Sequence, residues 1–162
     1  MIMVLFMSTR AQIFSADFII AASLFILLSG VAYYLWVEKS YSIEESKKFN
    51  KLIDAAYLAS NVWLREGTPK YWNADNIVEL GLQNDNKLNR TKMEMLNDLG
   101  YQKVKQLSGL SDYDFLLRVY RSNNQTLFEF GRLDEAKNVF KVKRISVLDG
   151  EIVFIETIVW SS

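Results

Sequence analysis

The sequence lacks several residue types on which common protein chemistry depends. Its 162 residues contain no cysteine and no histidine, which removes disulfide bonds and the commonest metal ligand and general base. Lys+Arg and Asp+Glu balance at 19 each, so no basic surplus points to nucleic acid. Asp85, Asp112 and Asp114 could hold a hard cation, but their spacing matches no known calcium loop. We therefore predict that the protein is not an enzyme and has no cofactor, no metal site and no nucleic-acid partner.

Charge is almost missing from the first forty residues, while the rest of the chain has an ordinary soluble composition. From Phe18 to Val37 the chain runs for about twenty residues without a charge, the length of a helix that crosses a bilayer core. Tyr33, Tyr34 and Trp36 gather at its C-terminal end, where aromatic rings favour the membrane interface. No small-x-small cleavage site follows this long run, which favours a retained membrane helix over a cleaved secretory signal.

Asp17 borders the apolar run, and Arg10 is the only other charged residue that precedes it. A carboxylate beside a membrane helix is costly and usually has a partner. The simplest interpretation is that Asp17 lies among the lipid headgroups and contacts water. The residues around it suggest a second interpretation.

The stretch Arg10-Ala11-Gln12, followed by Asp17 and an apolar helix from Phe18, resembles the class III signal peptide of archaeal type IV pilins and pilin-like proteins. The resemblance implies that a prepilin peptidase removes a leader, residues 1–11, by cutting between Ala11 and Gln12. It also implies that the apolar helix stays on the mature protein and packs against other pilin-like subunits. Asp17 and Phe18 would then lie at the assembly interface, and Asp17 stands in for the family's acidic residue, usually Glu.

The leader leaves two details of processing open. A cut after Ala11 makes Asp17 the sixth residue of the mature chain, whereas a cut after Gln12 makes it the fifth, the usual position in the family. A start at Met7 would give the leader the sequence MSTRA. In a dry bundle of helices, the Asp17 carboxylate could pair with the free α-amino group of a neighbouring subunit and set the axial register.

A single helix is predicted to continue beyond the membrane run. Apolar residues recur at helical spacing from Ile43 to Val62, and no proline occurs before Pro69. We expect the helix to end at Glu66-Gly67, because glycine followed closely by proline is a common stop. Residues 12–37 would form its membrane or filament-core part, and residues 38–66 a stalk that continues into the head.

Residues 67–162 are predicted to form a small α+β head outside the cytoplasm. Asn73 can cap a short helix over Ala74–Leu80, and Asn89 can cap a second helix through about Leu107, although Gly100 weakens its middle. Four strands with apolar residues at alternating positions follow: Tyr113–Arg121, Thr126–Gly131, Phe140–Leu148 and Glu151–Trp160.

The last two predicted strands are joined by Asp149-Gly150, a strong signal for a two-residue hairpin. We therefore predict a four-stranded, mainly antiparallel sheet that packs on the long helix, with Trp63 and Trp72 in the core. Turn and core residues between the long helix and the first strand are also similar to a segment of archaeal pilin-like membrane proteins, which implies a pilin-like fold. These residues are Gly67, Pro69, Trp72, Gly81-Leu82, Leu88-Asn89, Gly109-Leu110 and Tyr113-Asp114-Phe115.

Two Asn-x-Thr triplets are candidate N-glycosylation sites, and their use would place the head outside the cytoplasm. Asn124 lies in a predicted turn and is the better candidate, whereas the role of Asn89 as a helix cap is the preferred explanation for that residue. The sequence thus predicts a single-pass membrane protein that assembles, as a major or minor subunit, into a cell-surface filament for adhesion, motility, DNA uptake or secretion. The alternative is a membrane-anchored binding protein that does not polymerise.

Overall fold

The computed structural model describes the backbone of residues 8–132, 136 and 138–161, and the side chains from Ala16 onward within these ranges. The chain divides into two compact units, one ending at Lys47 and the other beginning at Lys48. Helix α1 (Ser8–Val62) belongs to both. Its length confirms the prediction of one long helix, and Met1–Met7, which include the predicted start at Met7, lie outside the described residues.

The second unit is an α+β fold built on a four-stranded sheet. The strands β3 (Asp114–Arg121), β4 (Thr126–Gly131), β5 (Val139–Leu148) and β6 (Glu151–Trp160) are arranged in the order β4-β3-β6-β5, and all neighbouring pairs are antiparallel. Their bounds agree with the predicted strands to within one residue. Asp149 and Gly150 have φ angles of 52° and 85°, which confirms the predicted two-residue hairpin between β5 and β6.

One face of this sheet is covered by helices. Leu52, Ala56 and Ala59 of α1 and Trp63 directly after its end follow one another at spacings of three and four residues and are at most 1% exposed, so they form one buried stripe. Trp63 stacks on Phe115 of β3 with ring centroids 5.8 Å apart, and its indole Nε1 donates a 3.0 Å hydrogen bond to Thr157 Oγ1. The predicted packing of the sheet on the long helix is therefore confirmed.

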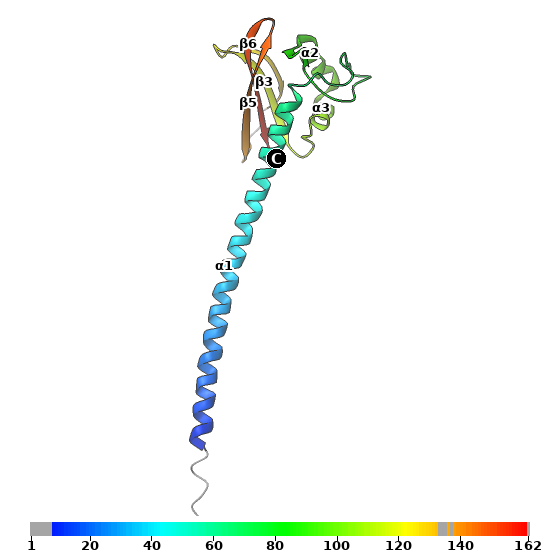
Figure 1. Cartoon of the computed structure of the whole chain (residues 1–162). Helices are drawn as coiled ribbons and strands as arrows, with labels where there is room; N and C mark the ends of the chain where they lie inside the picture. The colour runs from blue at the N-terminus through cyan, green and yellow to red at the C-terminus, as the bar shows by residue number, and fades with distance from the viewer. Residues whose placement is uncertain (1–7, 133–135, 137, 162) are drawn as a thin grey trace, which may run out of the picture. The chain divides into compact units, whose positions relative to one another are not determined.

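Two short helices cover the same face. Helices α2 (Arg90–Leu99) and α3 (Tyr101–Leu107) lie to one side of the sheet in Figure 1, and Tyr101 stacks on Phe115 with centroids 5.1 Å apart. The prediction of one helix through Leu107 was wrong, because Gly100 adopts φ 76° and ψ 154°. Gly100 ends α2 by donating its N–H to the Leu96 carbonyl, and its own carbonyl accepts from Val104 within α3.

Helix α1 ends at Val62 rather than at Glu66. The carbonyls of Trp63 and Arg65 accept hydrogen bonds from the N–H groups of Leu82 and Gln83, so they are turned away from a helical partner. Gly81 allows this close approach, since a Cβ atom there would lie 2.4 Å from the Arg65 carbonyl oxygen. A short hairpin of β1 (Gln83–Asn84) and β2 (Lys87–Leu88), which was not predicted, follows.

The predicted helix over Ala74–Leu80 is absent from the structure. Asn73 Oδ1 instead accepts hydrogen bonds from the N–H groups of Asp75 and Asn76, and the Thr68 carbonyl accepts from Val78 and Glu79. These bonds use the donors that a helix would need, so the segment forms a closed loop. We refer to Pro69–Val78, whose ends meet at the Thr68–Glu79 bridge, as the closed loop.

Candidate functional site

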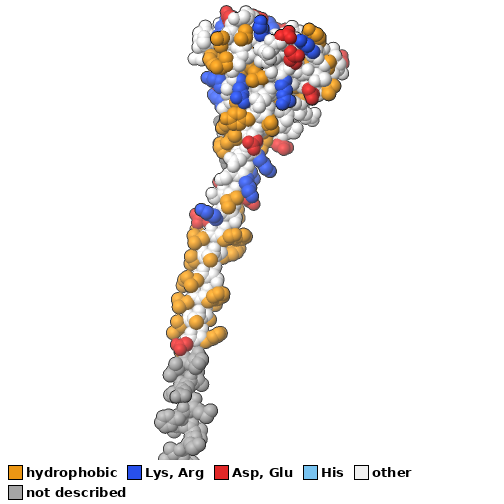
Figure 2. Space-filling view, viewed as in Figure 1, with side chains coloured by type: hydrophobic (Ala, Val, Ile, Leu, Met, Phe, Trp, Pro, Cys, Tyr) orange, Lys and Arg blue, Asp and Glu red, His pale blue; other side chains and the backbone are white. Residues whose placement is uncertain are grey.

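The first unit presents an apolar surface on all sides of α1. Large apolar side chains from Phe18 to Trp36 are between 51% and 74% exposed, and Figure 2 shows them along the visible face of the helix. A helix that is apolar all round lacks the polar face that a water-exposed helix needs. Among the described residues, α1 is the one helix long and apolar enough to cross a membrane, a criterion of length and hydropathy that a signal sequence near an N-terminus also meets.

Polar groups within or beside this run are satisfied by the helix itself. Ser23 Oγ donates to the Ile19 carbonyl at 2.7 Å, and Ser40 Oγ donates to the Trp36 carbonyl at 2.8 Å. Such bonds remove the cost of placing a hydroxyl in hydrocarbon. The rings of Tyr33 and Trp36 lie 6.4 Å apart at the C-terminal end of the run, where an interfacial aromatic cluster was predicted.

The residues of the predicted processing and assembly site lie in α1. The backbone of Ala11 and Gln12 is helical, and their side chains lie outside the described part of the structure. Asp17 is exposed, and Phe18 beside it is 74% exposed. The carboxylate therefore stands at the N-terminal border of an apolar surface.

The two candidate glycosylation residues lie in different environments. Asn89 caps α2, since its Oδ1 accepts a 3.1 Å hydrogen bond from the Lys92 N–H, and this confirms the predicted capping role. Asn124 is exposed in the predicted turn between β3 and β4, where it adopts a φ angle of 64°. Asn124 thus remains the better presented of the two side chains.

Of the three acidic residues considered as cation ligands, Asp112 and Asp114 are neighbours in the sequence, whereas Asp85 lies in the turn between β1 and β2. Asp85 accepts a 2.9 Å hydrogen bond from Lys70, and this contact lowers the pKa of the Asp85 carboxyl. Asp114 forms a 2.8 Å ion pair with Lys105 in a different part of the second unit. No group of three potential metal-binding side chains occurs within the part of the chain that the structure describes.

One lysine is buried in the second unit, which the sequence gave no reason to expect. Lys92 is 3% exposed, and its Nζ donates hydrogen bonds to the backbone carbonyls of Glu66 and Gln83. Burial lowers its pKa, and the nearby Glu66 carboxylate partly opposes this effect. Lys92 thereby ties α2 to the segments on both sides of the closed loop.

The closed loop is rigidly held and exposes apolar side chains. Trp72 is 1% exposed and donates from its indole Nε1 to the Gly81 carbonyl at 2.8 Å, while Lys103 of α3 donates to the Ala74 carbonyl at 2.8 Å. By contrast, Tyr71 is 75% exposed and Val78 is 68% exposed. A braced loop that exposes large apolar groups is typical of a binding surface.

The sheet face opposite the helices, here called the outer face, carries charged side chains across all four strands. Glu129, Arg118, Glu156 and Lys143 are paired in register from β4 to β5, and Arg118 Nε lies 2.8 Å from Glu129 Oε2. Glu156 also lies 3.3 Å from Lys141 Nζ. Such opposite-charge neighbours stabilise a solvated sheet surface.

The hairpin end of the outer face is apolar. Ile145 and Ile152 are 65% and 63% exposed, and Phe154 pairs in register with Ile145 and stacks on Tyr120 at 5.6 Å. Lys143 Nζ lies 5.3 Å from the centroid of the Phe154 ring. A surface hollow of about 380 Å³ adjoins this end and is lined by Arg121, Ser122, Asn123, Glu151 and Ile152.

Comparison with known proteins identifies no relative. No model of a protein family matches the chain, and neither a curated protein nor a solved structure is significantly similar to it.

Proposed function

We propose that this protein is a major or minor structural subunit of an archaeal type IV pilus-like filament that assembles through its N-terminal apolar helix. The observation that carries the proposal is the contrast between the two units: α1 is apolar all round from Phe18 to Trp36, whereas the second unit has its own buried core. In this proposal the second unit is a pilin-like head.

The exposed apolar surface requires a cover from outside the chain. Transfer of one such side chain from water is worth roughly 1.5–3 kcal/mol, so the run as a whole cannot remain in water. Lipid covers it in the membrane-inserted subunit, and the same helix of neighbouring subunits covers it in a filament. The protein would be a single-pass membrane protein before assembly, with its head outside the cytoplasm, and part of a cell-surface filament afterwards.

Asp17 has a specific role in this scheme. Cleavage by a prepilin peptidase beside Gln12 would create a free α-amino group less than two helical turns from the Asp17 carboxylate. Within a dry helical bundle, that amino group of one subunit can pair with Asp17 of another, and the pair would fix the axial register. The energy of assembly would come from helix packing, and the charge pair would select one arrangement.

The decisive test is intact mass and N-terminal peptide mapping of the protein from its native membrane. A mature chain that begins at Gln12 or Ile13 supports prepilin-type processing and the assembly role that depends on it. A chain that begins at Met1 or Met7 would contradict the proposal, because Asp17 would then be an interfacial residue of an uncleaved anchor.

The second candidate function is a single-pass membrane protein whose head binds a partner and does not polymerise. The observation that favours it is the closed loop, which holds Tyr71 and Val78 exposed on a braced frame. The two functions differ in oligomeric state. A uniform monomer in mild detergent, with an uncleaved N-terminus, would favour the anchored binding protein.

A further inference from the structure

Two surfaces of the second unit expose apolar side chains and differ in charge. The first, here called the sheet patch, consists of Ile145, Val147, Ile152 and Phe154 on the outer face. Val147 pairs in register with Ile152, as Ile145 does with Phe154, so the four side chains are contiguous on β5 and β6. The charged residues that share the outer face with the patch are Arg118, Lys141 and Lys143 against Glu129 and Glu156, which leaves a surplus of one positive charge.

The positive surplus is concentrated beside the apolar side chains. Arg121 is paired with Glu151 at 2.6 Å, and Glu156 is shared between Lys141 and Arg118. Lys143, which pairs in register with Glu156, lies over the rings of Tyr120 and Phe154. A lysine ammonium above an aromatic pair, next to exposed isoleucines, favours a partner that brings both an apolar side chain and a carboxylate.

The second surface, here called the loop patch, has that composition. It consists of Tyr71 and Val78 of the closed loop together with the exposed acids Asp75 and Glu79. No lysine or arginine occurs between Tyr71 and Leu82. Lys70 at the start of the loop is paired with Asp85 at 2.9 Å and lies 3.7 Å from Glu66. Lys103 of α3 donates to the Ala74 carbonyl beside Asp75, so Asp75 and Glu79 against Lys103 leave the loop patch apolar with a net negative charge of one.

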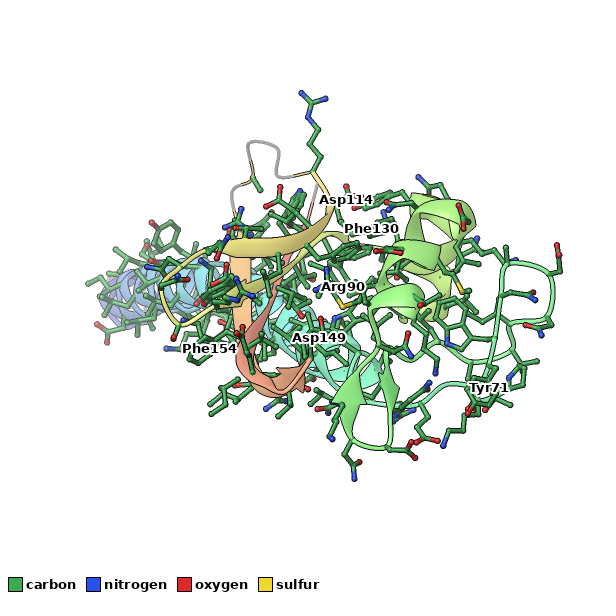
Figure 3. The ribbon with its side chains drawn as sticks, turned by 90° about the horizontal axis from the view of Figure 1, so that it is seen from above. Tyr71, Arg90, Asp114, Phe130, Asp149 and Phe154 are labelled. Carbon is green, nitrogen blue, oxygen red and sulfur yellow. The ribbon has the colours of Figure 1, made fainter. Side chains whose placement is uncertain are left out.

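The two patches cannot meet within one molecule. In the view from above, Phe154 of the sheet patch and Tyr71 of the loop patch lie on opposite sides of the second unit (Figure 3). Complementary surfaces on opposite sides of one body can contact each other only between copies. Such a contact is heterologous, and its repetition produces a ring or an open helical array rather than a closed dimer.

We propose that the loop patch of one copy docks on the sheet patch of the next copy, with the acidic loop facing Lys143. This contact rests on the proposed function, because it would set the order of heads in a filament whose helices supply most of the assembly energy. The hollow beside Ile152 provides space for a side chain of the loop. The partner is thus a second copy of this chain.

The contact is weak on its own. Stable protein interfaces bury about 1,200–2,000 Å² in total, and a handful of apolar side chains on each side supplies less than that. Helices held together in a membrane or filament raise the effective concentration of neighbouring heads, and a weak contact becomes populated under those conditions. The test therefore uses the full-length chain in membranes.

The absence of cysteine makes the contact directly testable by disulfide formation. We expect membranes that contain both a Val78→Cys chain and an Ile145→Cys chain to give a disulfide-linked dimer on mild oxidation. A chain that carries both substitutions should give a ladder of linked multimers. A matched control replaces Val78→Cys by Asp98→Cys, an exposed position on α2, and should give about tenfold less product with Ile145→Cys.

Charge-reversal substitutions provide a second test of the same contact, which does not depend only on the geometry of the two cysteines. In the cross-linking background, Lys143→Glu in one chain or Asp75→Lys in the other should each reduce the product, because like charges then face each other. The two substitutions together should restore it. Failure of the exchange to restore the product would overturn the proposed contact. So would a disulfide between two Val78→Cys chains that is as abundant as the mixed disulfide.

Filament assembly is measured in the same samples by sedimentation and electron microscopy. Filaments with no mixed disulfide above the Asp98 control would overturn the head contact and leave the proposed function in place. A mixed disulfide in membranes whose chains are uncleaved and form no filaments would support the contact and contradict the filament function.

Discussion

The two parts of helix α1 share one backbone conformation and differ in what covers their side chains. Between Phe18 and Trp36 every large apolar side chain is at least half exposed, whereas Leu52, Ala56 and Ala59 are buried within the second unit. A helix with one apolar stripe can be satisfied by its own domain, but a helix that is apolar all round needs lipid or other helices. The comparison motivates the proposal that the first part acquires its surroundings from outside the chain.

The largest expected effect separates two tryptophans, Trp36 in the apolar run of α1 and Trp63 directly after the buried end of the helix. Trp63→Ala should destabilise the second unit by about 3–5 kcal/mol, because it removes a fully buried ring that stacks on Phe115 and bonds to Thr157. Denaturant unfolding in detergent, followed by circular dichroism, measures this change. The matched variant Trp36→Ala removes a ring that is 67% exposed and should change the unfolding free energy by less than about 0.5 kcal/mol.

Equal losses of stability in Trp63→Ala and Trp36→Ala would contradict the division of α1 into a self-covered part and a part covered from outside.

Two leucines on α1 with almost the same exposure provide a second comparison. Leu27 is 62% exposed in the apolar run, and Leu58 is 64% exposed in the second unit. Leu27→Arg should impair membrane insertion, since arginine near the centre of a membrane helix costs about 2.5–3.5 kcal/mol. Leu58→Arg should leave insertion intact. Alkaline extraction of membranes separates inserted protein from released protein.

If Leu27→Arg remained fully resistant to alkaline extraction, the apolar run would not be a membrane-spanning helix, and the proposed route to a filament would fail.

Asp17 provides a smaller and more specific effect at the border of the apolar run. Asp17→Ala should leave processing at Gln12 intact and reduce incorporation into filaments by at least about tenfold, because it leaves the α-amino group of the neighbouring subunit buried without a partner. Asp17→Glu keeps the charge and should retain most of the yield. Quantification of sheared filaments by immunoblot measures incorporation, and a normal yield of Asp17→Ala filaments would remove the electrostatic role.

The sequence was sufficient for the regular parts of the fold because their signals are local. Alternating apolar residues and the Asp149-Gly150 turn define β5 and β6, and the uninterrupted helical spacing defines α1. Residues Ala74–Leu80, which include the second half of the closed loop, were mispredicted as a helix because Asn73 can cap a helix or form a local turn with the same hydrogen bonds. The choice depends on Thr68, which pairs with Glu79 from outside the segment.

The candidate surfaces were only partly predictable. Asp17 is conspicuous in the sequence because a charge borders an apolar run. The sheet patch is not conspicuous in the sequence, because β5 has apolar residues on both faces. Only the position of α1 determines that Val142 is buried while Ile145 is exposed. The burial of Lys92 depends likewise on carbonyls from two distant segments, Glu66 and Gln83, which converge only in the folded chain.

Lys92 gives the smallest expected effect, and its sign follows from the direction of its pKa shift. Burial lowers the pKa of Lys92 below its usual value of 10.5 in the folded protein. At pH values between the lowered pKa and 10.5, the unfolded chain therefore binds more protons at this residue than the folded chain does. The unfolding free energy contributed by Lys92 should rise with pH across this window and stay constant below it.

The variant Lys92→Met lacks this titration, so subtraction of its unfolding free energy from that of the wild type cancels the groups common to both. Urea unfolding between pH 7 and the usual lysine pKa of 10.5 should show this difference shifting in favour of the wild type as the pH rises. A difference independent of pH would mean that the hydrogen bonds to Glu66 and Gln83 offset the cost of burial in full. Lys92 would then act in the second unit as a fixed cation, whereas Asp17 is expected to meet its partner only on assembly.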